Sequence, residues 1–173
     1  MDLYVPNKYC QSIFTIDYDK LKEENIKCLL FDLDNTIASM KMKKPDNRII
    51  EHFKKLLEMG FKFMILTNAL KHRVKPFGEI LVIYVYYMAF KPLSYKYKKI
   101  MNKYNFKAQE IAAIGDQLMT DIKGANKLGI VSILVNPLSE EEHFLTKLNR
   151  IRERKVFRYL SRQNLLKRGD YYE

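Results

Sequence analysis

The sequence IKCLLFDLDNTI, residues 26–37, joins an apolar run to two closely spaced aspartates. The apolar part, Ile26 to Phe31, predicts a strand that is buried on both faces of a parallel sheet. Asp32 and Asp34 follow at its carboxyl end. Because unpaired carboxylates are costly to bury, we expect both at the mouth of the strand, facing water or a metal. Open α/β sheets carry their chemistry at the carboxyl ends of strands, which is where this stretch puts two carboxylates.

The composition describes a globular protein of one domain. A chain of 173 residues can bury roughly 70% of its unfolded surface, and a hydrophobic content of 47% argues against disorder. Two cysteines cannot form a disulfide framework, and the first residues do not resemble a secretory signal, so we expect a cytoplasmic protein. The longest apolar run, Ile80 to Phe90, is too short to span a bilayer and predicts another core strand. The net charge of +11 favours an anionic partner without identifying it.

Strands and helices alternate along the rest of the chain. Helices are expected at 17–25, 46–59, 70–79, 94–104 and 120–128, and further strands at 61–67, 81–87, 111–115 and 130–135. This alternation predicts an α/β fold with a doubly wound, Rossmann-like sheet of five parallel strands in the order 3-2-1-4-5. Residues 1–138 would form the core with an N-terminal leader, and residues 139–173 a basic helical tail that packs on the core or extends from it.

Four of the expected strands end in polar residues. These are Asp32 and Asp34, Thr67 and Asn68, Lys91, and Asp116 with Asp121 further on. Because the carboxyl ends of parallel strands meet at one edge, these side chains should share a crevice. Several carboxylates can hold Mg²⁺, one can attack phosphorus, and a lysine can neutralise charge on the transferred group. The set therefore predicts phosphoryl transfer.

The motifs FDLDNT, TN, KP and GDQLMTD, in this order, resemble those of the haloacid dehalogenase (HAD) superfamily of aspartate-nucleophile phosphatases. The resemblance is narrower with the YqeG-type family of subclass IIIA and covers residues 3–160. It implies a Mg²⁺-dependent phosphatase that hydrolyses a phosphomonoester through an aspartyl-phosphate. Ala38 and Ala69 depart from the bulkier and polar residues expected in this family, which affects loop detail rather than chemistry.

The same resemblance implies a role for each strand-end residue. Asp32 is the nucleophile and a metal ligand, while Asp34 is the general acid/base and offers its backbone carbonyl to the metal. Lys91 holds the phosphoryl group against Asp32. The remaining positions are Thr67 and the Asn68 amide, which bind the phosphoryl group, and Asp116 with Asp121 in support, which complete the Mg²⁺ site.

The spacing between motifs leaves no room for an inserted cap domain. Nine residues separate Thr36 from Asp46, and one helix and one strand fill the interval from Asn68 to Lys91. We therefore expect an open, capless site, suited to a large or membrane-borne phosphate or to a lid from another subunit. The substrate is then a phosphorylated small molecule or a phospholipid head group. The family resemblance offers phosphatidylglycerophosphate, since some relatives act in phospholipid synthesis.

Other interpretations of the two aspartates fit less well. An EF-hand loop would need Gly at the sixth position and Glu at the twelfth, where Ile37 and Lys43 stand. A receiver-type phosphoacceptor domain shares the fold and the acidic crevice, but the distribution of Thr, Lys and the last Asp fits it poorly. Asp121 could also be a carboxylate that merely starts a helix.

The tail carries most of the net charge. From Lys147 to Arg168 there are nine Lys and Arg residues against the single Glu153, which leaves +8 of the total +11. A four-residue spacing predicts a basic stripe on a helix, made of Arg150, Arg154, Arg158 and Arg162. Such a helix can lie on an anionic membrane as a peripheral contact, bind RNA phosphates, or pack on the domain with solvated arginines. The alternative to an enzyme is thus a non-catalytic HAD-like module that binds membrane or RNA through this tail.

Overall fold

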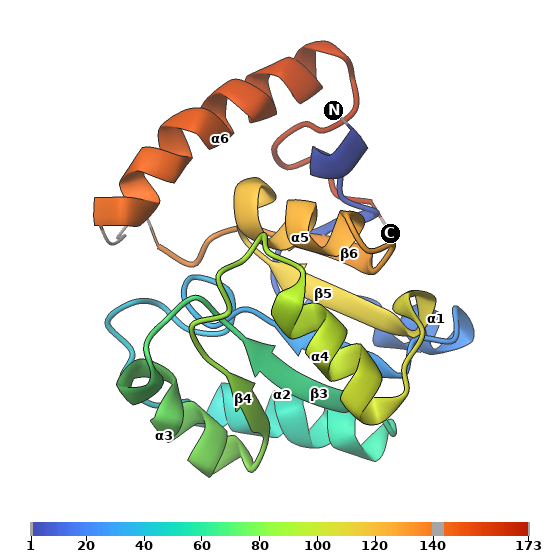
Figure 1. Ribbon diagram of the computed structural model, residues 1–173, viewed down its shortest axis with the longest axis vertical. Helices are drawn as coiled ribbons and strands as arrows, with labels where there is room; N and C mark the ends of the chain where they lie inside the picture. Colours follow the sequence, from blue (N-terminus) through green and yellow to red (C-terminus); the bar gives the residue numbers. More distant parts are fainter. Residues whose placement is uncertain (1, 140–143, 173) are drawn as a thin grey trace.

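The described residues form one parallel sheet of six strands in the order β1-β6-β5-β2-β3-β4, with helices packed around it (Figure 1). The structure, a computed structural model, describes residues 2–139 and 144–172, and only the backbone of 144–151. Neighbouring strands are parallel throughout. The strands are β1 (Lys8–Cys10), β2 (Cys28–Phe31), β3 (Lys62–Leu66), β4 (Tyr84–Tyr86), β5 (Ile111–Gly115) and β6 (Val131–Val135).

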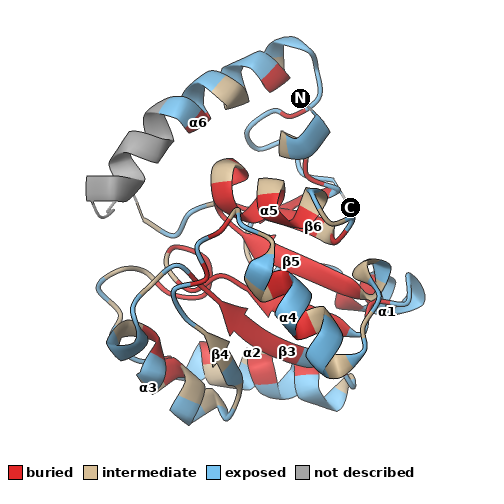
Figure 2. Cartoon of the chain, viewed as in Figure 1, coloured by how far each residue is buried: buried red, intermediate tan, exposed pale blue. Residues whose placement is uncertain are grey.

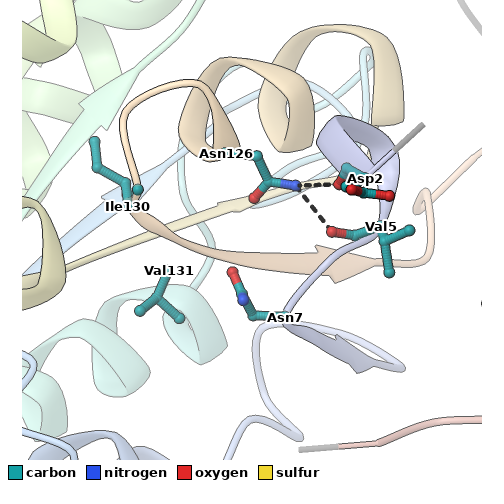
Figure 3. Close-up of a pocket in the computed structure, with 7 residues that line it drawn as sticks. Asp2, Val5, Asn7, Asn126, Ile130 and Val131 are labelled. Carbon is teal, nitrogen blue, oxygen red and sulfur yellow. Dashed lines mark hydrogen bonds between the residues drawn. The ribbon is translucent and has the colours of Figure 1, made fainter.

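The predicted five-strand order is wrong because the segment expected as a leader supplies a sixth strand. The five expected strands keep their mutual order, and β1 is added beside β6, with Lys8 opposite Ile133. Strand β1 has three residues, too few to show a period of hydrophobicity in the sequence. Its pairing depends on the free edge that β6 offers. Figure 3 shows how the preceding turn is held: the Asn126 amide donates to the Val5 carbonyl at 2.8 Å, beside a small cavity of about 260 Å³.

Strand β4 is shorter and more exposed than the core strand predicted over 81–87. Leu81 instead ends a helix, and Val82 closes that helix in the left-handed conformation (φ 54°). The strand pairs only with β3, and Tyr84 is 59% exposed. An edge strand has one neighbour and little cover, so β4 is not the core strand that the apolar run predicts.

Six α-helices surround the sheet. They are α1 (Tyr18–Glu23), α2 (Asn47–Glu58), α3 (Lys71–Leu81), α4 (Tyr95–Tyr104), α5 (Lys123–Asn126) and α6 (Phe144–Arg162). Asp46 caps α2, accepting a hydrogen bond from the Ile49 amide at 2.9 Å. Pro76 lies inside α3. The helix expected over 120–128 is replaced by a π-helical turn, Leu118–Ile122, and the short α5.

Helices α1 to α5 form two layers, one on each face of the sheet (Figures 1 and 2). Helices α1, α2 and α3 cover one face, where alternate strand residues such as Phe31 and Ile65 pack on Phe53 and Phe77. Helices α4 and α5 cover the other, where Leu30 and neighbouring strand residues pack. Burial on both faces explains why the central strands are apolar without interruption.

Helix α6 runs along one side of the molecule beyond α5 and β6 (Figure 1). Its C-terminal half packs through Leu160, and the segment after it through Leu166, on an apolar cluster with Leu118 and Leu134. Glu153 is buried and accepts a hydrogen bond from the Leu118 amide at 2.5 Å. Within the described residues, no helix is long and apolar enough to cross a lipid bilayer.

Candidate active site

A buried ion cluster lies at the carboxyl edge of the sheet, where β2, β3 and β5 end. The Lys91 ammonium donates to Asp32 Oδ1 at 2.6 Å, to Asp121 Oδ1 at 2.5 Å and to the Leu66 carbonyl at 2.8 Å. Asp32 follows β2, and Asp121 lies in the π-helical turn after β5. All three side chains are at most 9% exposed. The topology thus brings together charges that are far apart in sequence, as predicted from the strand ends.

One ammonium faces two carboxylates in this cluster, so one negative charge is left over. Burial raises the pKa of Asp32 to about 7, although Lys91 pulls the pKa down, because burial disfavours the charged form and Asp121 repels it. For Lys91, burial favours the neutral amine, but the Asp121 and Asp32 carboxylates outweigh it and raise the pKa above its usual value. The ammonium is therefore strongly bound. When both carboxylates are ionised, the cluster keeps one excess negative charge, which a bound cation would neutralise.

The carboxylates at this edge fit a divalent cation. Asp32, Asp116 and Asp121 are buried, and each offers an oxygen within 4.8 Å of the others. Gly115 makes room for this arrangement, because a Cβ at that position would overlap the Asp121 carboxyl. Hard carboxylate oxygens are the ligands that Mg²⁺ prefers. The donor set and the excess negative charge both match this metal.

Thr67 and Asn68 lie beside Lys91, at the end of β3. The Asn68 side chain accepts from the Lys91 amide at 2.7 Å and donates to the Lys91 carbonyl at 3.2 Å. Thr67 is buried, and its hydroxyl accepts from the Ala69 amide at 3.1 Å. The Asn68 side chain therefore positions the backbone that carries Lys91. This role differs from the phosphoryl binding that the family resemblance implies for the Asn68 amide.

Arg73 is a residue of this region that the sequence did not single out. It projects from the first turns of α3, and its guanidinium contacts Asp34 Oδ1 through Nε at 2.9 Å and through Nη2 at 2.8 Å. The same group donates to the carbonyls of Met42 at 2.7 Å and Ser39 at 3.1 Å. Arg73 thus fixes Asp34 and the loop after β2 together. An arginine on an amphipathic helix gives no sequence signal for such a role.

Comparisons with known proteins agree with this geometry. A model of the HAD-hydrolase-like family matches residues 89–160. The chain is 36% identical over 160 residues to the probable phosphatase YqeG of Bacillus subtilis, which covers 92% of this chain and 93% of that protein.

Solved structures share the fold. A HAD-superfamily (subfamily III A) hydrolase from Legionella pneumophila superposes with a TM-score of 0.53 at 24% identity, over 69% of this chain and 71% of that one. The 3-deoxy-D-manno-octulosonate 8-phosphate phosphatase of Moraxella catarrhalis, solved with magnesium and phosphate, gives 0.55 at 16% identity, over 72% and 77%. With the extensive identity to the Bacillus protein, these findings show that the chain belongs to the YqeG-type family of HAD-superfamily phosphatases.

Proposed function

We propose that this phosphatase hydrolyses a phosphomonoester in two steps, with Asp32 as the nucleophile. The observation that carries the proposal is the contact of Asp32 with Lys91 at 2.6 Å, within a group of three carboxylates at the sheet edge. An aspartate held in this way presents one oxygen to the ammonium and keeps the other for attack. A buried ammonium nearby also stabilises charge on the transferred phosphoryl group.

In the first step, the Asp32 carboxylate attacks phosphorus and the bond from phosphorus to the ester oxygen breaks. Asp34 gives its proton to the departing oxygen. In the second step, the Asp34 carboxylate takes a proton from water, whose oxygen attacks phosphorus and releases inorganic phosphate and free Asp32. Both Arg73 contacts fall on Oδ1 of Asp34, which leaves Oδ2 for proton exchange. Asp34 is partly exposed, consistent with access to water.

The cofactor in this proposal is Mg²⁺, held by Asp32, the backbone carbonyl of Asp34 and Asp116, with Asp121 in support. When bound, it supplies positive charge to the phosphate oxygens. Lys91 supplies the second positive charge and keeps Asp32 oriented. Thr67 and the Asn68 amide bind the phosphoryl oxygens.

We further propose a large or membrane-borne substrate, for which phosphatidylglycerophosphate is the candidate that the family resemblance offers. Apolar side chains on the loop around Lys91 support this: Phe90 and Leu93 are each 60% exposed, and Met88 is 39% exposed. Lys91 itself is buried, so these side chains form an exposed apolar surface of the kind that marks contacts with lipid or protein. Arg154, Arg158 and Arg162 on α6 are also exposed, while the Arg150 side chain lies outside the described residues.

The deciding experiment is hydrolysis of p-nitrophenyl phosphate by the purified protein. We expect turnover that requires Mg²⁺ and is lost in Asp32→Asn, with Glu79→Gln, an exposed site on α3, as the matched carboxylate control. An inert wild-type protein would favour the non-catalytic module.

For the membrane contact, flotation with vesicles that contain or lack anionic lipid is the measurement. Recovery should require anionic lipid and fall in Phe90→Ser, while Leu57→Ser on α2 should leave it unchanged. Equal recovery from both kinds of vesicle would exclude this contact, and competition by RNA would assign the basic surface to nucleic acid.

A further inference from the structure

A cavity of about 830 Å³ lies between α6 and the ends of β1 and β6. Its wall includes Asp116 on the side of the ion cluster, and Glu153, Arg154 and Phe157 from α6 on the other. Arg168, from the segment after α6, completes this wall. The volume is in the range of small-molecule sites. Because Asp116 belongs to the cation-binding carboxylates, the cavity adjoins the place where phosphoryl transfer would occur.

Two carboxylates, Asp116 and Glu153, and two guanidinium groups, Arg154 and Arg168, line the cavity. Asp116 belongs to the carboxylate group of the active site, and Glu153 is buried and bound to the Leu118 amide. Arg154 and Arg168 are exposed to solvent, and within the described residues neither forms an ion pair. Two guanidinium groups therefore remain available to an anion that enters the cavity.

Part of this wall is already ordered for binding. The Arg168 guanidinium lies over the Phe157 ring, 5.4 Å from its centroid, which restricts where its donors can point. Phe157 is half-buried against the cluster that holds α6 on the sheet. An arginine stacked in this way loses less rotamer entropy when it binds an oxyanion, and its fork suits a phosphate or carboxylate.

From these observations we infer that the cavity is a leaving-group subsite in which Arg154 and Arg168 bind a second anionic group of the substrate. The inference rests on the proposed phosphatase function. The substrate class is a phosphomonoester that carries a further phosphate or carboxylate on a compact linker. Helix α6 then helps to select the substrate, a role that an inserted cap domain has in larger members of the superfamily.

The test compares propane-1,3-diol bisphosphate with n-propyl phosphate, which lacks the second phosphate group. The wild-type enzyme should have a kcat/KM at least about tenfold higher for the bisphosphate, the effect of one charge-assisted contact. Arg154→Gln and Arg168→Gln should each lower this ratio, and the double variant should bring it to about 2, the statistical value for a compound with two equivalent phosphomonoesters. Arg152→Gln, an exposed arginine of α6 that lies outside both the cavity wall and the basic stripe, is the matched control and should keep the wild-type ratio. The ratio is insensitive to a loss of folded protein.

A second measurement does not depend on turnover. Calorimetric titration of Asp32→Asn with both compounds in Mg²⁺ should show tighter binding of the bisphosphate, and this preference should disappear in the Asp32→Asn variant that also carries Arg154→Gln and Arg168→Gln. Binding of the bisphosphate that is no more than about twofold tighter, or a ratio of kcat/KM no higher than about 2 in the wild type, would overturn the subsite, because two equivalent phosphates alone give this factor. If p-nitrophenyl phosphate is still hydrolysed in that case, the proposed function stands. If nothing is hydrolysed but the binding preference is found, Arg154 and Arg168 still bind an anion, while the phosphatase proposal and the assignment of the cavity to a leaving group both fail.

The second anion could belong to a soluble metabolite or to a lipid head group. The same pair of compounds linked to a two-chain lipid anchor, presented in detergent micelles, separates these sources. A larger effect of Arg154→Gln on the anchored pair assigns the site to lipid, and an equal effect on both pairs assigns it to the soluble compound. If Arg154→Gln lowers the preference for the bisphosphate in neither pair, the inference is contradicted.

Discussion

The carboxyl edge of the sheet and the aromatic core beneath α2 are built on opposite principles. At the edge, Lys91 and two aspartates are buried together, at the cost of desolvating every charge. Beneath α2, the Phe53 ring lies 5.1 Å from the rings of both Phe31 and Phe63, so burial there removes apolar surface from water. The carboxyl edge should therefore determine activity, and the aromatic core should determine stability. Substitutions can separate the two.

The largest effect is expected at the edge. Asp32→Asn should lower kcat for p-nitrophenyl phosphate by at least about a thousandfold, because the nucleophile is lost. In metal-free buffer, its free energy of unfolding should not fall, because the substitution removes a buried negative charge and leaves Lys91 paired with Asp121. Urea unfolding in EDTA measures this. A clear loss of stability would mean that the ion cluster also holds the fold together, so that activity and stability are not separated between the two regions.

The aromatic core should show the reverse. Phe53→Ala should lower the free energy of unfolding by about 3–5 kcal/mol, the usual range for a fully buried phenylalanine. Urea unfolding gives the value, and Leu57→Ala on the exposed side of the same helix should change it by less than about 0.5 kcal/mol. The kcat per folded molecule should stay near the wild-type value. A loss of kcat beyond the loss of folded protein would couple the two regions.

Arg73 tests whether the edge extends to α3. Arg73→Gln should lower kcat about 10- to 100-fold with little change in KM, because it releases Asp34, which exchanges the proton. Arg73→Lys should restore part of kcat, since an ammonium can still reach one oxygen of Asp34. Lys75→Gln, an exposed residue on the same helix, is the control. Steady-state kinetics distinguish this role from a structural one, which would reduce the folded fraction and leave kcat per folded molecule unchanged.

The smallest effect concerns His52, which borders the aromatic core. Burial lowers its pKa to about 4, helped by the charges of Lys55 and Arg48. Between the unfolded value of about 6.5 and the folded value, the unfolded state binds more protons, so stability is present above pH 6.5 and is lost as the pH falls toward 4. His52→Gln should remove about 1–2 kcal/mol of this pH dependence, allowing for partial solvent exposure. Urea unfolding at pH 7 and pH 4.5 measures the difference, and an identical pH slope in both proteins would contradict it.

The central strands and the ion cluster could be predicted from sequence because both follow from one rule. Continuous apolar runs become buried parallel strands, and the residues that end them meet at one edge. Asp32, Lys91, Asp116 and Asp121 were found in this way and do lie close together. Their catalytic roles remain predictions that the kinetics must test.

What escaped prediction depends on docking between distant segments. The strand Lys8–Cys10 is too short to show a period, and it forms because β6 offers a free edge. Arg73 resembles any solvated arginine until α3 is placed beside the loop after β2. The cavity that Arg154 lines exists only because α6 packs on the edge formed by β1 and β6. None of these is encoded by spacing along the chain.

Detection of the covalent intermediate on Asp32 is the most direct way to identify this residue as the nucleophile. Acid quench during turnover, followed by borohydride reduction, converts an aspartyl-phosphate to homoserine, which mass spectrometry locates. We predict homoserine at position 32 and at no other aspartate. With p-nitrophenyl phosphate, whose leaving group needs no proton, the amount should be larger in Asp34→Asn because only water activation is slowed. Turnover without homoserine at position 32, or its appearance at Asp116 or Asp121, would contradict the assignment of Asp32 as the nucleophile.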